Sequence, residues 1–263
     1  MRLSVVLITQ NEEANLGRTL QSVQALTGEG KGEIVLVDSG STDRTLEIAG
    51  SFHAKIFRAP WKGFAQQKNS AIEKASGDWV LQLDADEPLE AELCVELQEL
   101  LEKNDERLAG YFIPRKNFFL GRWIRHGGFY PDPKLRLVRR GAGKFEEYGA
   151  HPTIKLNAGL NAGQTKHAML HYAYPTLRGY IDHMNSYSSM GAKFAVASRR
   201  RGFSFLDIVV RPWLTFIYNY GFRLGFLDGR EGLLLHLYHA VYVSWKYAKV
   251  WELSRTEPNS PQP

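Results

Sequence analysis

The sequence is poor in features that define several classes of protein. It contains one cysteine, Cys94, among 263 residues. A single thiol excludes an internal disulfide and is typical of a reducing compartment, and we expect it to pack on a helix. Apolar stretches without charged residues fall short of the roughly 20 residues that a membrane-spanning helix needs. The N-terminus enters a strand-like run at once, without the pattern of a signal peptide, so we expect a cytoplasmic active site.

The chain is rich in apolar residues and carries an excess of positive charge. Hydrophobic residues make up 44% of it, enough for one sizeable core with an appendage. The formal net charge of +5 is compatible with nucleic acid, a phosphorylated glycan or an acidic membrane surface as partner. The basic residues are spread out and form no recognition helix or aromatic sheet motif, so we do not expect nucleic acid as a partner.

Strand-like runs alternate with helical patterns through the first 104 residues. The runs cover residues 3–9, 33–38, 55–57 and 79–84, and a Leu-rich helix is expected over 89–101. Alternation at this rhythm builds βαβ units with right-handed crossovers. The sequence therefore predicts an α/β, Rossmann-like fold with a mainly parallel central sheet and a C-terminal helical extension.

The pattern changes after residue 104. Strands are expected at 110–113 and 134–138, separated by a loop at 117–133, and a helical pattern covers 176–201. We therefore expect one domain over residues 1–201, in which 1–104 and 105–201 form two halves. Amphipathic helices follow at 202–255 and a disordered tail at 256–263.

The region 202–255 mixes basic and aromatic residues. They are Arg211, Trp213, Phe216, Tyr218, Arg223, Trp245, Lys246, Lys249 and Trp251. Such a mixture suits helices that lie in the interface of an anionic membrane. The alternatives are a helical cap on the main domain and a dimer face.

Three carboxylates follow the run at 79–84. On an extended chain Asp84 and Asp86 point to the same face, and ligands of α/β folds bind at this end of the strands. Oxygen ligands that converge there suit Mg²⁺ or Mn²⁺. The alternative is that Asp86, Glu87 and Pro88 only start the next helix, because acids favour helix N-termini.

Four segments at strand ends stand in order: residues 9–12, 38–43, 63–69 and 84–87. Together they resemble the nucleotide-sugar half of a family 2 glycosyltransferase with the GT-A fold. Residues 127–132, with Arg136 and Leu137, extend the resemblance to the WaaE-like lipopolysaccharide core β-glucosyltransferase branch.

The resemblance implies a UDP-sugar donor. Asp38 and Asp84 would contact the uracil and the ribose, because a carboxylate accepts hydrogen bonds from ring N–H groups and hydroxyls. Thr9 and Glu12 would line the same pocket.

The resemblance also implies residues for the diphosphate. Lys68 would reach it as a point charge, unless it is a solvated lysine on a helix surface. Asp86 would bind the divalent cation, which neutralises charge on the departing UDP.

Inversion at the sugar carbon needs a base for the acceptor hydroxyl. The family usually supplies an acid where this chain has Ala150, His151 and Pro152. Asp132 is the first candidate base and Glu147 the second, while His151 could act as base or metal ligand. Asp132 could instead pair with Arg136, and His151 could be a core residue. We expect His171 to be structural.

The implied activity is an inverting transfer of glucose from UDP-glucose onto a lipopolysaccharide core or a related lipid-linked glycan. Basic residues would suit a phosphorylated core: Arg115, Lys116, Arg122, Arg125 and His126. A polyprenyl-phosphate glycosyltransferase is the alternative, because its anionic acceptor needs no base. A non-catalytic nucleotide- or nucleic-acid-binding protein is a further one. The enzyme would act in the cytoplasm, peripherally attached to the inner face of the cytoplasmic membrane.

Overall fold

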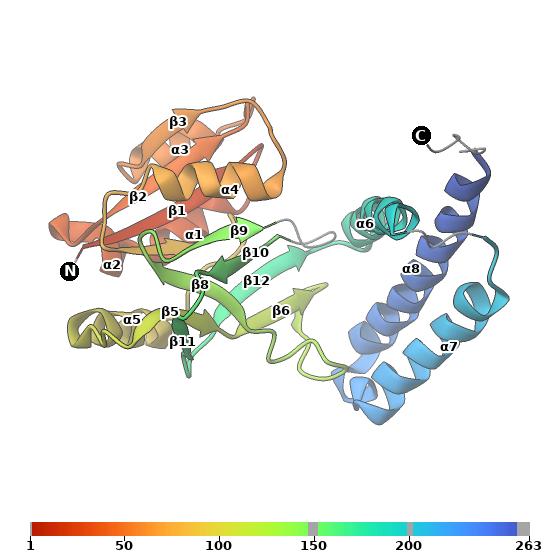
Figure 1. Ribbon diagram of the computed structural model, residues 1–263. Coiled ribbons are helices and arrows are strands. Elements are labelled where there is room, and N and C mark those ends of the chain that lie inside the picture. The colour runs from red at the N-terminus through yellow and green to blue at the C-terminus, as the bar shows by residue number, and fades with distance from the viewer. Residues whose placement is uncertain (1, 147–151, 199–201, 257–263) are drawn as a thin grey trace. The chain divides into compact units, whose positions relative to one another are not determined.

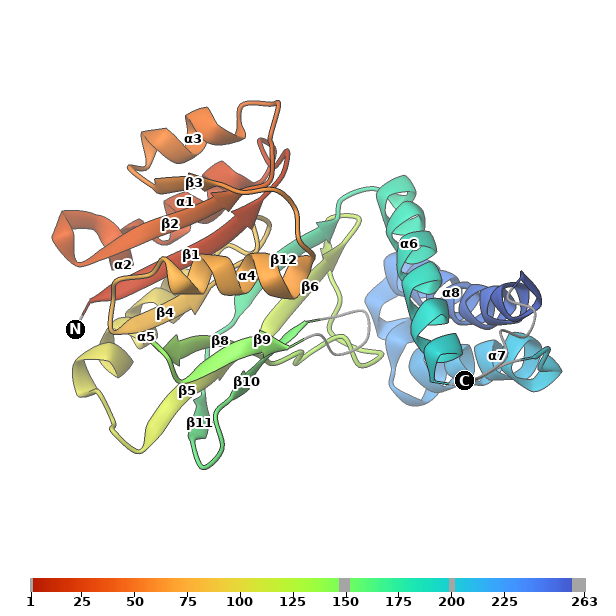
Figure 2. The same ribbon diagram turned by 45° about the horizontal axis from the view of Figure 1, so that its top comes forward.

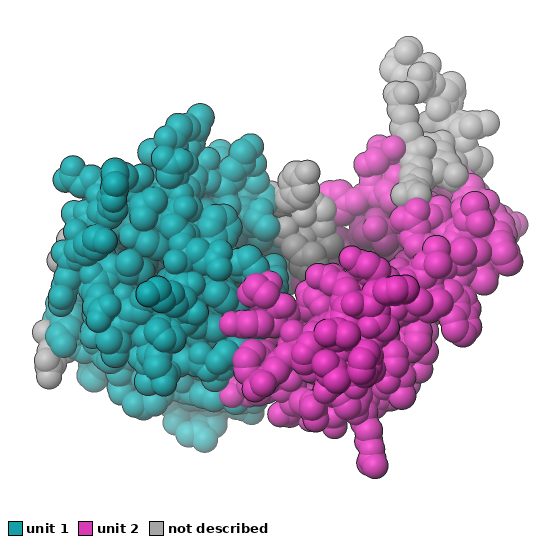
Figure 3. Space-filling model, turned by 90° about the horizontal axis from the view of Figure 1, so that it is seen from below, with its two compact units in different colours: residues 1–116, 132–147, 152–171 teal, residues 117–131, 148–151, 172–263 magenta. Residues whose placement is uncertain are grey.

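The computed structural model describes residues 2–146, 152–198 and 202–256 (Figure 1). These residues form two compact units (Figure 3). Unit 1 holds the described residues up to 116, from 132 to 146 and from 152 to 171. Unit 2 holds those from 117 to 131 and from 172 onwards. The helix after residue 176 therefore groups with the C-terminal helices, so the units do not coincide with the division drawn at residue 201.

A seven-stranded sheet in the order β11-β5-β8-β4-β1-β2-β3 forms the centre of unit 1 (Figure 2). Its strands are β1 (Leu3–Thr9), β2 (Gly32–Asp38), β3 (Lys55–Arg58), β4 (Trp79–Gln82), β5 (Leu108–Ile113), β8 (Lys134–Arg139) and β11 (Asn161–Gln164). Strands β3, β2, β1 and β4 are mutually parallel, whereas β8 runs antiparallel to both β4 and β5. The mainly parallel α/β sheet is confirmed.

Helices cover both faces of this sheet because β1 and β2 are apolar on both sides. Val5 and Leu7 pack with one group of helices, whereas Val6 between them packs with α4 (Phe64–Glu73). Successive side chains of a strand point to opposite faces, so one continuous apolar run supplies two cores. The first group of helices comprises α1 (Leu16–Ser22), α2 (Gln24–Thr27), α3 (Thr45–Ser51) and α5 (Ala91–Lys103). A short 3₁₀ turn, η1 (Gly28–Gly30), follows α2.

Smaller sheets complete the β structure. Strands β9 (Gly143–Glu146) and β10 (Thr153–Leu156) form an antiparallel pair that packs with α4. A three-stranded sheet has the order β12-β6-β7, with β12 at Met169–Tyr174, β6 at Arg115–Phe119 and β7 at Arg122–Trp123. The expected loop at 117–133 thus contains strand residues. Apolar and polar residues do not alternate in this segment, so the sequence did not indicate these strands.

Unit 2 is mainly helical. Its elements are α6 (Leu177–Ala197), η2 (Leu206–Val210), α7 (Arg211–Phe216), η3 (Ile217–Phe222), η4 (Gly225–Asp228) and α8 (Gly229–Thr256). The Thr176 side chain caps α6 by accepting a hydrogen bond from the Gly179 N–H. Within the described part of the chain, no helix is long and apolar enough to cross a bilayer.

A buried carboxylate ties the loop at 117–131 to these helices. Asp228 accepts hydrogen bonds from the backbone N–H groups of Arg125 (3.2 Å) and His126 (2.8 Å). Gly127 and Gly128 follow with positive φ and lie against the side chains of His236 and Arg223. The positive φ of both residues favours glycine, and a Cβ atom at Gly127 would also collide with the His236 ring.

Two further side chains of unit 1 lie in the core. Cys94 is buried on α5, as expected, and burial raises the pKa of its thiol to about 11. Glu33 on β2 is also buried, and its carboxylate accepts hydrogen bonds from Ser4 Oγ (2.6 Å), Ser76 N (2.6 Å) and Lys55 Nζ (2.6 Å). Burial opposes ionisation, but these partners prevail and lower the pKa of Glu33 to about 2.

We expect Glu33→Gln to lower the free energy of unfolding at pH 7 by about 2 to 3 kcal/mol, because hydrogen bonds to a charged group are lost. Unfolded Glu33 binds its proton near pH 4.5 and folded Glu33 near pH 2. The contribution of its charge is therefore fully present above pH 4.5 and is lost as the pH falls towards 2. The difference between variant and wild type should shrink over that range in urea unfolding curves. Glu47→Gln on the exposed surface of α3 is the control and should change little; a pH-independent difference would contradict the assignment.

Candidate active site

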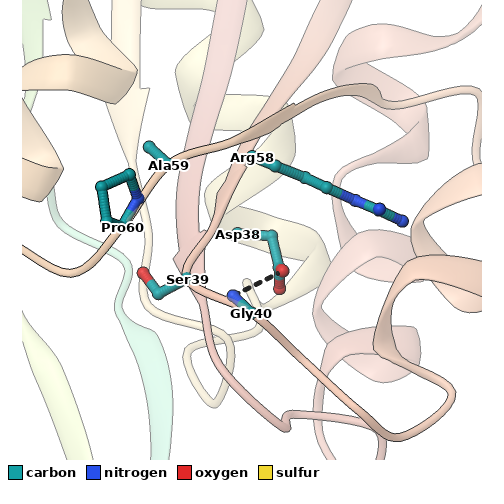
Figure 4. A pocket seen from close by; sticks show the side chains of 6 residues that line it. All are labelled: Asp38, Ser39, Gly40, Arg58, Ala59 and Pro60. Atoms are coloured by element: carbon teal, nitrogen blue, oxygen red, sulfur yellow. Dashed lines mark hydrogen bonds between the residues drawn. The ribbon is translucent and has the colours of Figure 1, made fainter.

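The carboxyl ends of β1, β2, β3 and β4 meet at one edge of the sheet because these strands are parallel. An open pocket of about 270 Å³ lies there between the ends of β2 and β3 (Figure 4). Its lining residues are Asp38, Ser39, Gly40, Arg58, Ala59 and Pro60. Crevices at this end of a parallel sheet are the usual ligand sites of α/β folds. The pocket is therefore the first part of the candidate site.

Asp38 shapes this pocket. One carboxylate oxygen accepts a hydrogen bond from Thr9 Oγ1 (3.2 Å), and the other accepts bonds from Gly40 N and Ser41 N (both 2.9 Å). Burial opposes ionisation of Asp38, yet the bonds from Ser41, Gly40 and Thr9 hold its pKa below the usual value. Gly40 has a φ of 96°, a conformation that favours glycine. The ionised carboxylate thus fixes the turn at the mouth of the pocket, and Thr9 orients it.

The acidic segment after β4 is a turn. Strand β4 ends at Gln82, the Glu87 N–H donates to the Asp84 carbonyl (3.0 Å), and the Asp84 N–H donates to the Glu87 side chain (3.0 Å). The expectation that Asp84 and Asp86 share one face of an extended strand is therefore wrong. The Glu87 side chain closes the turn before the strand can continue. The next helix, α5, begins only at Ala91.

Buried ion pairs hold this turn in place. Glu87 is fully buried and contacts Arg136 (2.6 Å) and Arg115 (3.0 Å). Arg136 also reaches Asp84 (3.0 Å), whose other oxygen lies 2.6 Å from Lys68 Nζ. The two arginines lower the pKa of Glu87 against the effect of burial, and Lys68 and Arg136 do the same for Asp84. Both carboxylates are therefore ionised.

Lys68 is not a solvated surface lysine. It is buried on α4, and its ammonium group lies 5.3 Å from the centre of the Phe145 ring. Burial lowers its pKa, which Asp84 partly restores. Glu12 also lies in this region. Burial raises the pKa of Glu12, the hydrogen bond from Asn15 opposes this effect, and the charge of Asp84 adds to it. The contacts of Lys68 and Glu12 with a bound nucleotide stay predictions.

Asp86 differs from its acidic neighbours. Burial and the carboxylates of Glu87, Asp84 and Glu12 raise its pKa to about 7. Its Oδ2 lies 3.6 Å from Nε2 of His171, and burial, followed by the charge of Arg115, lowers the pKa of His171 to about 3. A carboxylate among like charges beside a neutral imidazole fits a divalent cation. Among the described residues, no group of three His, Cys, Asp or Glu side chains is placed to hold a metal ion.

His171, expected to be structural, thus lies beside the candidate metal ligand Asp86. A lone histidine on a strand gives no sequence signal of this kind, because its neighbour Asp86 lies on a distant turn. Arg115 is a second residue that sequence reasoning placed elsewhere. It was expected at the acceptor surface, but it belongs to the buried ion pairs around Glu87. Arg136 also belongs to these ion pairs. The sequence sign of its burial is its position between the apolar Leu135 and Leu137 in a buried strand.

Of the three candidate bases, the structure describes one. Asp132 contacts Arg115 (2.6 Å) and Lys134 (2.8 Å). Burial opposes its ionisation, but these cations lower its pKa to about 2. Glu147 and His151 lie outside the described residues.

Comparisons with known proteins identify the family to which the chain belongs. The family described as Glycosyl transferase family 2 matches residues 4–166. The lipopolysaccharide core biosynthesis glycosyltransferase LpsC of Rhizobium meliloti is 32% identical over 95% of this chain and 92% of its own length. An uncharacterized glycosyltransferase of Rickettsia typhi is 28% identical over 98% of this chain and 89% of its own.

Among solved structures, the mannosyltransferase PcManGT from Pyrobaculum calidifontis, in complex with GDP-Man and Mn²⁺, superposes with a TM-score of 0.56. The match covers 97% of this chain and 88% of that one at 16% identity, so it shows a shared GT-A fold. With the family match over most of the chain and the relative in Rhizobium, the protein belongs to glycosyltransferase family 2.

Proposed function

We propose that the protein transfers glucose from UDP-glucose, with inversion, onto a lipopolysaccharide core or a related lipid-linked glycan at the cytoplasmic face of a membrane. The observation that carries the proposal is Asp86, a buried carboxylate among like charges beside His171, at the sheet edge that also bears the pocket of Asp38. The name of the relative LpsC supports the acceptor. The complex of PcManGT supports a nucleotide sugar and a metal ion.

Each part of the site has a task in this reaction. The pocket beside Asp38 and Gly40 would hold the nucleoside, and Asp84 would accept hydrogen bonds from the ribose. Asp86 and His171 would hold Mg²⁺ or Mn²⁺, which neutralises charge on the departing diphosphate. Lys68, held beside Asp84, would add a fixed positive charge on the same side.

The ion pairs of Asp132 make it poorly suited to act as the general base. A general base works best when its pKa lies near the working pH, and two cations keep Asp132 far below it. This pairing favours a role for Asp132 in positioning Arg115. Glu147 and His151 stay candidates for the base.

The pairing of Asp132 with Arg115 and Lys134 also favours the alternative acceptor, a polyprenyl phosphate. A polyprenyl phosphate is already an anion and needs no base. Incubation with UDP-[¹⁴C]glucose and either phosphorylated core oligosaccharide or polyprenyl phosphate decides between the two acceptors. Label in the core supports the proposal, and label only in polyprenyl phosphate replaces it.

Asp86→Asn should weaken Mn²⁺-dependent binding of UDP by at least about tenfold, because a charged metal ligand is lost. Thermal unfolding with UDP, with and without Mn²⁺, measures this through the shift in Tm. Asp182→Asn, the same change at an exposed position of α6, should keep the full shift. If Asp86→Asn also kept it, the metal would bind elsewhere.

Asp132→Asn should retain more than a tenth of the wild-type kcat, because its carboxylate serves the ion pair with Arg115. Loss of a true base would lower kcat by a factor of about 100 or more. Single-turnover kinetics with saturating donor measure the rate of the sugar-transfer step directly. A hundredfold loss, in a variant with unchanged UDP binding, would identify Asp132 as the base after all.

A further inference from the structure

A continuous helical segment in unit 2 exposes apolar side chains along its length. It runs through η2, α7 and η3, from Leu206 to Phe222. Its exposed large apolar residues are Leu206, Val209, Trp213, Leu214, Ile217, Tyr218 and Phe222, spaced three and four apart along two adjoining rows. Trp213 is 65% exposed and Phe222 79%. Side chains at this spacing form one stripe on a helix, and here the stripe faces solvent.

The opposite face of the same segment is already packed. Helices α7 and α8 lie side by side (Figure 1). Ser244 Oγ donates to the Ile208 carbonyl (2.8 Å), Arg211 donates to the Tyr247 hydroxyl (3.1 Å), and Pro212 is buried. The exposed stripe is therefore a second apolar face, which internal packing does not use.

Exposed apolar side chains continue on both sides of the segment. Phe203 and Phe205 precede it, and Leu224, Phe226 and Leu227 follow it. We call the exposed apolar side chains from Phe203 to Leu227 the apolar surface. Large exposed apolar patches mark sites of interaction with proteins or membranes.

The charge of this region is positive. Between residues 193 and 230 the sequence holds seven Lys and Arg and two Asp, a formal net charge of +5 that equals the charge of the whole chain. Asp207, the acidic residue within the apolar surface, is paired with Arg211 at 2.8 Å, so its negative charge is neutralised. Arg223 lies over the ring of Tyr218, at 5.8 Å from its centre. Exposed Trp and Tyr with flanking basic residues suit the headgroup region of an anionic bilayer.

We propose that the apolar surface inserts into the interface of an anionic lipid bilayer and holds the enzyme there. The inference rests on the proposed function, in which the acceptor carries a lipid. A helical segment with one packed and one exposed apolar face would lie in the plane of the bilayer, with its exposed stripe among the acyl chains. A second copy of this chain is the less suitable occupant, because two regions of charge +5 would repel each other.

Flotation of the full chain with vesicles tests the proposal. The wild type should float with phosphatidylcholine vesicles that contain 30% phosphatidylglycerol, and less with pure phosphatidylcholine or at high salt. The double variant Trp213→Glu/Phe222→Glu should reduce the bound fraction at least tenfold. The control Val95→Glu/Leu160→Glu places the same charges at exposed apolar positions of unit 1 and should float like the wild type.

Two further measurements separate a loss of lipid binding from a loss of UDP binding and from dimerisation. The Mn²⁺-dependent Tm shift with UDP should be unchanged in both double variants, so a failure of lipid binding and a failure of the proposed function give different results. Equal flotation of wild type and Trp213→Glu/Phe222→Glu, or no flotation of the wild type, would overturn the proposal. A concentration-dependent dimer in light scattering that this variant abolishes would overturn it in favour of a second copy.

Discussion

The candidate site depends on Glu87, a carboxylate buried between Arg115 and Arg136. An unpaired charge at such a position destabilises a protein by about 3 to 5 kcal/mol, so all three groups must be in place together. Glu87 also closes the turn that carries Asp84 and Asp86, through the Asp84 N–H. One side chain thus connects the acidic turn to β8 through Arg136 and to β6 through Arg115.

This network divides four neighbouring carboxylates into two kinds. Asp84, Glu87 and Asp132 each contact a cation and have lowered pKa values. Asp86 has acids as its charged neighbours, and its pKa is raised. The pKa values of four chemically similar carboxylates therefore differ because their neighbours differ. Three are held by ion pairs, and the fourth is the carboxylate that we propose as the metal ligand.

The fold was predictable because its signals are local. The apolar runs at 3–9 and 33–38 and the helices between strands predicted the sheet, and the strand ends indicated where the candidate site would lie. The turn at 84–87 was not predictable in the same way. It depends on contacts of Glu87 with Arg136, 49 residues further along, and with Arg115, 28 residues along. Periodicity over a short window carries no information about partners at that distance.

The same limit applies to the basic residues. Arg115 and Lys116 looked available for an anionic acceptor, yet Arg115 pairs with Glu87, and Lys116 Nζ lies 2.6 Å from Glu90. Sequence reveals that a charge exists but not which charge it neutralises. The apolar stripe of residues 206–222 is the converse case, because helical spacing indicates a face without telling whether protein covers it.

Strand β1 sets the distance between the two parts of the candidate site. Its Thr9 is in register with Asp38 on one side, and its Val6 is in register with Gln82 on the other. The pocket beside Asp38 and the acidic turn therefore follow the two strands that flank β1, which lie about 10 Å apart at the usual strand spacing. Changes in the surrounding loops leave this separation constant, because the strand register sets it. A single inserted residue in β1 would shift both halves out of register at once.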